Sequence, residues 1–181
     1  VIWGFSNEIF ERLKEMKMVV NDLAPVVDPE ACKYVLERFC VESGVKLIYH
    51  SWASGVAMSG DRIDAVFLET KSGPVAIRGK YFVDASGDGD LIEWSGEDFY
   101  EMKHHIGAMY RIGGVPENMK GVGVKTPIAG VRNGHMHGYN DQDGLDVLNL
   151  SRLQTDLRKE MWDRTQALKE KEGGENIYLL E

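Results

Sequence analysis

The chain has 181 residues, of which 43% are hydrophobic and 28% are charged, a balance typical of a folded globular protein rather than a disordered one. The formal net charge is −8 and no basic cluster stands out, which argues against a nucleic-acid partner. No run of 18 apolar residues is present, so the sequence predicts no membrane-spanning segment.

The chain opens with an amphipathic helical pattern. Apolar residues recur at a spacing of 3.6 residues from Phe5 to Met16, and Ser6 or Asn7 is the expected N-cap. A connector at residues 21–27 follows. We therefore predict a first helix over roughly residues 6–16.

Start and stop signals predict a second helix. Asp28 is an N-cap residue, proline follows at the first helical position, and Gly44 is placed to end the helix. The apolar stripe between them includes Cys32 and Cys40, which eight helical residues separate by about 12 Å, too far for a disulfide. Two unpaired thiols fit a reducing compartment, and we expect a cytoplasmic protein.

The period then changes from helix to strand. Residues 45–49 read as a strand, and three further strands at 53–58, 63–70 and 75–78 are separated by turn residues, which predicts a three-stranded β-meander. Residues 81–85 form a short apolar run that leads into the glycine-rich turn SGDGD. A strand buried on both faces of a parallel sheet has this pattern, and ligands gather beyond the carboxyl ends of such strands. The alternative is an acidic surface turn after an ordinary strand.

The remainder of the chain predicts a strand, a glycine-rich region and a long helix. Residues 104–115 read as a strand, residues 121–139 as a glycine-rich hairpin region, and Ser151 with Gln154 as a capping box that opens a long helix near 152–172. We predict a domain boundary in the segment 91–97, which divides the chain into domains at 1–94 and 95–181.

Several motifs occur together and in order: DPE at 28–30, ESGV at 42–45, DASGDGD at 84–90, LSR at 150–152 and ENIYL at 175–179. In this combination the chain resembles the FAD-dependent oxidoreductases with a dinucleotide domain of the glutathione reductase type, and within them the subfamily whose motif reads D-A-T-G-D-x-D. The resemblance implies an α/β fold with a partial Rossmann-like domain, in which the meander is inserted between parallel strands, followed by part of a β-rich substrate domain with a long helix.

The resemblance also implies roles for individual residues. The first meander strand, near Ala53, would offer backbone groups to the adenine ring, and Ala85, Ser86, Gly87 and Asp88 would lie close to the flavin nucleotide. Small residues there permit close backbone approach, and the Ser86 hydroxyl could donate a hydrogen bond. A histidine of the substrate domain could act as an acid or base, but the sequence names no catalytic residue.

The chain departs from the family pattern where FAD phosphates are normally held. No Gly-x-Gly-x-x-Gly turn is present, and the motif at 121–123 lacks the third glycine. The chain also begins without Met and ends on an apolar run, so we interpret it as an internal fragment of a flavoenzyme. We expect the fragment alone to bind FAD weakly or not at all, to be inactive, and to self-associate through apolar surface left by absent strands; its partners would be the rest of the polypeptide and a small-molecule substrate.

Other sites were weighed from the residues. A calcium loop starting at Asp84 would place Ser95 where a bidentate Glu is required, which excludes an EF-hand. His104-His105 and His135-x-His137 could be zinc ligands, but no cysteine or carboxylate is spaced to complete the set, so we interpret them as solvent or loop histidines and predict no metal. A non-catalytic α/β ligand-binding or interaction module is the alternative to the enzyme.

Overall fold

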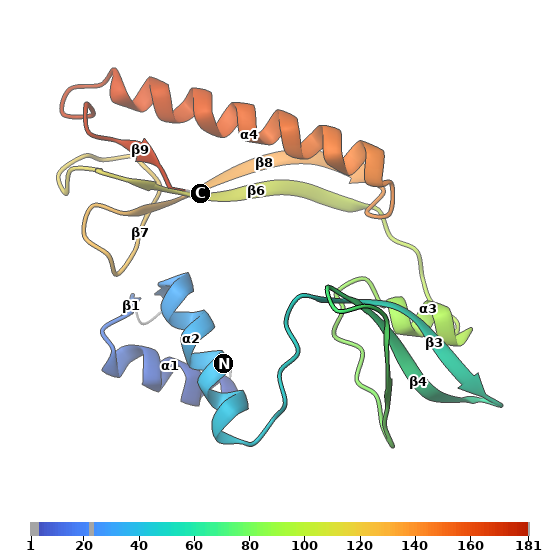
Figure 1. The fold of residues 1–181 in the computed structure, drawn as a ribbon. Helices are drawn as coiled ribbons and strands as arrows, with labels where there is room; N and C mark the ends of the chain where they lie inside the picture. Colours follow the sequence, from blue (N-terminus) through green and yellow to red (C-terminus); the bar gives the residue numbers. More distant parts are fainter. Residues whose placement is uncertain (1–3, 22–23, 181) are drawn as a thin grey trace. The chain divides into compact units, whose positions relative to one another are not determined.

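A computed structural model describes residues 4–21 and 24–180 of the chain (Figure 1). The chain forms two compact units, one from Val1–Gly44 together with Met102–Glu181 and the other from Val45–Glu101. Each unit is described separately. No helix of the described residues is long and apolar enough to cross a membrane.

The unit Val45–Glu101 is built on an antiparallel meander, as the sequence predicts. Strands β3 (Ser51–Ser59), β4 (Arg62–Thr70) and β5 (Val75–Arg78) pair in the order β3-β4-β5. Gly60 and Gly73 occupy the two turns with φ of 65° and 104°, which L-residues with a Cβ rarely adopt. Helix α3 (Asp90–Ser95) packs against β3, so the glycine-rich turn that precedes it belongs to the same unit.

The two predicted parallel strands at 45–49 and 81–85 are wrong for this structure. Both segments lack strand hydrogen bonding, and every strand pairing among the described residues is antiparallel. Tyr81 is 91% exposed and Val83 is 89% exposed. An apolar run forms a buried strand only where neighbouring strands supply hydrogen bonds and cover its faces, and no described segment does so here. The Rossmann-like parallel sheet is therefore not part of the described structure.

The other unit begins with two helices around a small core. Helix α1 (Phe5–Glu15) and helix α2 (Pro29–Glu42) flank a short ladder of β1 (Val19–Val20) with β2 (Val26–Val27) in the chain. The sequence predicts a connector at residues 21–27, and the β2 strand lies within it. The most buried side chains of this core are Leu13, Ala31, Val35 and Phe39.

The caps of these helices follow the local signals in part. Asp28 accepts a hydrogen bond from the Ala31 amide at 2.9 Å, so the predicted cap of α2 is confirmed, as is Gly44 with φ of 72° just beyond its end. The predicted cap of α1 is wrong: α1 begins after Gly4 and has no side-chain cap. Cys32 and Cys40 are free thiols, as expected.

The same unit contains a four-stranded antiparallel sheet covered by the long helix. Strands β7 (Val124–Lys125), β8 (Arg132–Gln142), β6 (His104–Gly113) and β9 (Tyr178–Leu179) pair in the order β7-β8-β6-β9. Helix α4 (Val147–Lys169) lies along one face of β6 and β8 (Figure 1). The core between helix and sheet is formed by one set of buried residues: Tyr110, Ile112, Val115, Val122, Met136, Leu157 and Ile177.

The predicted capping box of the long helix is wrong in register. Helix α4 starts at Val147, where Asp146 accepts a hydrogen bond from the Asn149 amide at 3.0 Å. Ser151 lies inside the helix, and its hydroxyl donates to the Val147 carbonyl at 2.7 Å. An aspartate five residues earlier satisfies the free amides of the first turn, so the helix extends back to it.

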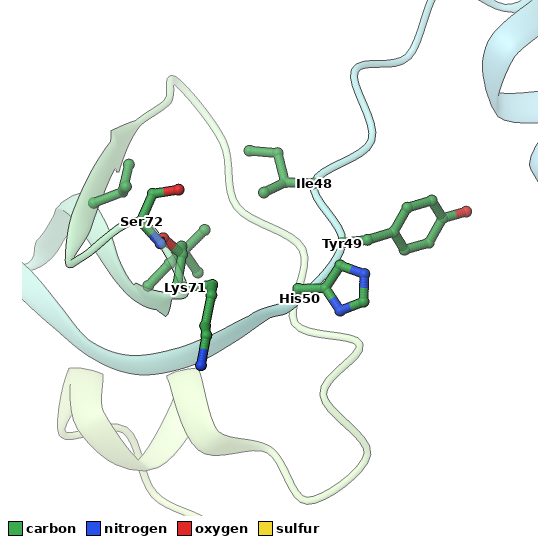
Figure 2. Close-up of a pocket in the computed structure, with 8 residues that line it drawn as sticks. Ile48, Tyr49, His50, Lys71 and Ser72 are labelled. Atoms are coloured by element: carbon green, nitrogen blue, oxygen red, sulfur yellow. The ribbon is translucent and has the colours of Figure 1, made fainter.

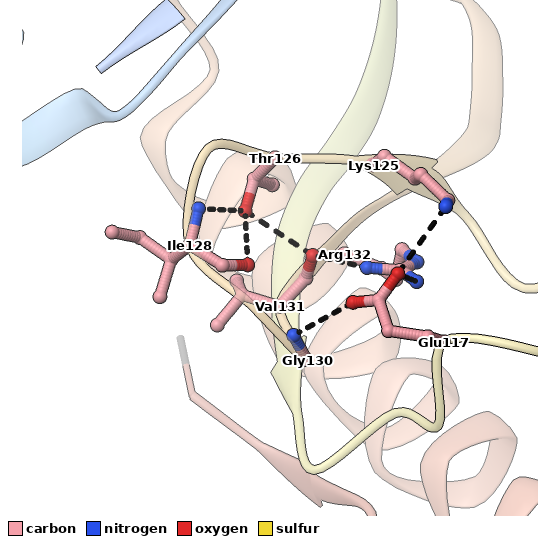
Figure 3. A network of polar contacts seen from close by, with 7 residues as sticks. All are labelled: Glu117, Lys125, Thr126, Ile128, Gly130, Val131 and Arg132. Atoms are coloured by element: carbon pink, nitrogen blue, oxygen red, sulfur yellow. Dashed lines mark hydrogen bonds and ion pairs between the residues drawn. The ribbon is translucent and has the colours of Figure 1, made fainter. Parts of the chain in front are cut away.

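A polar network holds the loop between β6 and β8 (Figure 3). The Glu117 carboxylate accepts from Lys125 at 3.2 Å, from the Gly130 amide at 3.3 Å and from Arg132 at 3.3 Å. Arg132 is only 2% exposed, and the buried hydroxyl of Thr126 bonds to carbonyl groups of the same loop. Hydrogen bonds from Lys125 and Gly130, together with the charge of Arg132, lower the pKa of Glu117.

Candidate functional site

The turn at residues 84–90 is organised by the Asp84 carboxylate. One oxygen accepts from the Ser86 amide at 3.0 Å and from the Ser86 hydroxyl at 2.7 Å. The other accepts from the amides of Leu91 and Ile92, at 3.0 and 3.4 Å. The hydroxyl and the amide of Ser86, and then the two helical amides, hold the pKa of Asp84 below its ordinary value. Asp84 thus ties the turn to the first residues of α3 as a structural anchor.

The Ser86 hydroxyl is used within the turn. It donates its hydrogen to Asp84 and accepts from the amides of Gly89 and Asp90, both at 3.2 Å. A hydroxyl has a single hydrogen to donate. In this conformation Ser86 therefore shapes the loop, and a hydrogen bond from Ser86 to a flavin remains a prediction.

The outer side of the turn is open. Ala85, Ser86, Gly87 and Asp88 are all exposed, and a Cβ built on Gly87 would meet no atom within 4 Å. Gly87 has φ of 104°. The amides of Gly87 and Asp88 make no hydrogen bond to any residue that the structure describes. Exposed amides on a backbone without a bulky side chain can donate to phosphate or ribose oxygens, so the chemistry of these donors fits a nucleotide.

Ala53 lies on an edge strand of the meander. Strand β3 pairs only with β4, so its outer edge has no strand partner among the described residues. The pairing changes register between Ala53 and Gly55, which leaves Ser54 as an extra residue in a bulge. Backbone groups on such an edge are available to a planar heterocycle, in keeping with the role that the resemblance implies. Since α3 packs against β3, all five predicted residues lie in one compact unit.

The same unit contains a pocket that sequence reasoning missed (Figure 2). Its volume is about 390 Å³, and it lies between the segment 48–50 and the β4–β5 turn. It is lined by three apolar and five polar or aromatic residues: Ile48, Leu68, Val75, Tyr49, His50, Thr70, Lys71 and Ser72. None of the five predicted cofactor residues lines it. The only sequence signal was the apolar run 45–49, which was interpreted as a strand rather than a pocket wall.

The metal alternatives can be compared with the geometry. Among residues 4–21 and 24–180, no group of three or more His, Cys, Asp or Glu side chains is placed to hold a metal ion. Asp84 is also engaged with four donors of its own turn, which leaves it unsuited to a calcium loop. The histidines predicted to be solvent residues, His104, His105, His135 and His137, are exposed.

Comparison with known proteins gives one match. The family model described as FAD dependent oxidoreductase matches residues 1–122, which include Ala53 and the whole 84–90 turn. No curated protein and no solved structure matches the chain. The matched segment spans more than half of the 181 residues, and the chain belongs to the FAD-dependent oxidoreductase family.

Proposed function

We propose that the chain is part of a flavoenzyme that oxidises or reduces a small molecule, with an FAD-binding domain of the glutathione reductase type. The observation that carries the proposal is the open turn at 85–88, which lies inside the matched segment, presents exposed amides and leads into helix α3, which packs against the edge strand β3. Bound FAD would supply the electron-transfer chemistry.

The residues of this chain would bind and orient the nucleotide. The amides of Gly87 and Asp88 would donate to its oxygen atoms, and Ala85 would keep the approach free of a large side chain. Backbone groups of β3 near Ala53 would hold the adenine ring. Asp84 would not contact the nucleotide; its four hydrogen bonds would hold the turn against α3.

The remaining contacts to FAD would come from elsewhere in a longer polypeptide. The 181 residues contain no Gly-x-Gly-x-x-Gly turn for the pyrophosphate. The apolar segments at 45–49 and 81–85, which form no strand ladder in this structure, would then gain strand partners from additional segments of the sheet. On this proposal the 181-residue chain alone binds FAD weakly and has no oxidoreductase activity. Its two free thiols also support a cytoplasmic location.

The test is the flavin content of the complete polypeptide encoded by the gene. We expect the purified protein to show a bound-flavin absorbance band in the visible and to release FAD on denaturation. Gly87→Val should lower the flavin content, because a branched side chain would stand over the exposed amides at a φ of 104°.

Gly121→Val is the matched control. Gly121 also has a positive φ, of 72°, and open space around its Cβ position, but it lies in the other compact unit. Equal flavin content in the two variants would show that the turn at 85–88 does not contribute to FAD binding. A colourless protein that FAD cannot reconstitute would refute the flavoenzyme and favour a non-catalytic ligand-binding module.

A further inference from the structure

Three histidines lie on the face of the four-stranded sheet that is opposite α4. Side chains of successive strand residues point to opposite faces. Met136 is fully buried in the core under α4, so its neighbour His135 points the other way and is exposed. His137 is also exposed, and its ring contact with His135 places it on the same face. His105 comes from β6 and reaches the same group across the strand pair.

The His135 and His137 rings are close together. Their centroids are 4.7 Å apart and their planes are inclined by 78°. The His105 ring is farther away, with its centroid 6.0 Å from that of His137. Strand pairing holds the backbone at His135, since Met109 lies opposite His135 and Ala108 lies opposite Met136. His137 lies at the register shift between Ala108 and Ile106, where no partner residue pairs with it.

His105 differs from the pair because its own ring is engaged. Its Nε2 accepts from the Gly138 amide at 3.3 Å, which requires the hydrogen on Nδ1, and Nδ1 then donates to the Asn140 side-chain oxygen at 2.6 Å. Both nitrogens are therefore occupied. His105 is a fixed neighbour of the pair and would have to break two hydrogen bonds to bind anything else.

The separation of the pair suits two imidazoles that share one ion. With metal–nitrogen bonds of about 2.1 Å and a tetrahedral angle, two ring centroids lie roughly 5 Å apart. The His135 and His137 rings have nearly this separation, so side-chain rotation alone could direct a nitrogen of each ring at one point. Imidazole ligands favour ions such as Zn²⁺, Ni²⁺ and Cu²⁺, whereas Mg²⁺ and Ca²⁺ require oxygen ligands.

We propose that His135 and His137 form a two-histidine site for a divalent transition-metal ion. No third His, Cys, Asp or Glu of the described residues is placed to complete it. Its other coordination positions are therefore open to water or to a small chelating ligand. The site shares no residue with the proposed flavin site, and the proposal does not rest on FAD binding.

The test is titration of the 181-residue chain with Ni²⁺ by isothermal calorimetry. We expect one saturable site per chain. Loss of an outer-shell partner already costs metal sites about 10–100-fold in affinity, so His135→Gln and His137→Gln should each weaken binding at least tenfold. The double variant keeps three histidines and both thiols, and so measures the background from those groups in the same protein.

His104→Gln is the matched control, because His104 is an exposed histidine of β6 without a ring contact to the pair. It should leave the Ni²⁺ affinity unchanged, and His105→Gln should change it by less than about threefold. Bound Cu²⁺ should show splitting from two nitrogen ligands in its electron paramagnetic resonance spectrum. The proposal is overturned by the absence of a saturable site, by a double variant that binds as tightly as the wild type, or by a His104→Gln loss equal to that of His135→Gln.

Discussion

Gly138 of β8 lies where the backbone of β6 leaves no room for a side chain. A Cβ added to Gly138 would lie 1.7 Å from the Ile106 carbonyl oxygen and 2.9 Å from the Gly107 Cα. The pairing changes register on both sides of Ile106, so the ladder is irregular at this point. Gly138 does not have a positive φ, and the effect of a substitution is therefore steric rather than conformational.

We expect Gly138→Ala to destabilise the unit substantially. The atom in the way belongs to backbone, which cannot rotate aside, so the strands must separate by more than 1 Å. Overpacking of this kind costs about 1–3 kcal/mol. Each ladder hydrogen bond that is lost adds about 1 kcal/mol. A total of about 3 kcal/mol should lower the midpoint of thermal unfolding by roughly 6–12 °C in a chain of this size.

The measurement is thermal and urea unfolding followed by circular dichroism. Gly144→Ala is the control, because its Cβ would make only an ordinary contact of 3.5 Å with the His104 ring and its φ is not positive. It should unfold within about 0.5 kcal/mol of the wild type. If Gly138→Ala has the same unfolding midpoint as Gly144→Ala and the wild type, then the close approach of the β6 and β8 backbones at Gly138 is wrong.

Three further predictions concern the core, the turn and the loop network. Leu153→Ala should lower the free energy of unfolding by about 2–5 kcal/mol, because Leu153 is 0% exposed. Leu148 lies in the same helix but is 81% exposed, so Leu148→Ala should lower it by less than about 0.5 kcal/mol. Both values are measured by urea titration. The pKa of Asp84 is lowered by its hydrogen bonds, so their stabilisation is present above the ordinary aspartate pKa of about 3.9 and is lost as pH falls below it. The protection of the amides at the start of α3, measured relative to their intrinsic exchange rates, should fall over that range and in Asp84→Asn at neutral pH, but not in Asp88→Asn; equal protection in both variants would contradict the anchoring role. Glu117→Gln should lower the unfolding midpoint because it leaves a buried guanidinium without its carboxylate, and an unchanged midpoint would show that the loop does not depend on this ion pair.

Several elements could be predicted because their causes are local. The Asp28 cap acts over three residues, and the two meander turns depend on glycines that tolerate a positive φ. The long helix was also predicted, but with Ser151 as its cap, because both Ser151 and Asp146 satisfy the local rule. Asp146 is the cap because it lies earlier in the chain and residues 147–150 between it and Ser151 are helical.

In the candidate site, too, features that depend on local residues could be predicted and features that depend on neighbouring segments could not. The glycine-rich turn and its exposure follow from residues 84–90 themselves, since Asp84 and Ser86 bond within the turn. The predicted strand at 81–85 failed because burial is a property of the neighbours, and periodicity cannot say whether those neighbours are present. The pocket beside residues 48–50 was missed for the same reason.

Amino-acid order alone was enough to predict three of the four helices of the described residues, the meander and the acidic turn, because each depends on contacts within a few residues; helix α3 was not predicted. The spacing His135-x-His137 is visible in the sequence, but only the tertiary structure showed that the two rings are in contact, that His105 is their neighbour, and that Arg132 meets Glu117. His105 meets Asn140 across 35 residues of chain, and the pairing register of β6 with β8 decides that meeting. A shift of one residue in this register would turn every side chain of a strand to the other face, and local sequence does not encode the two bulges that set it.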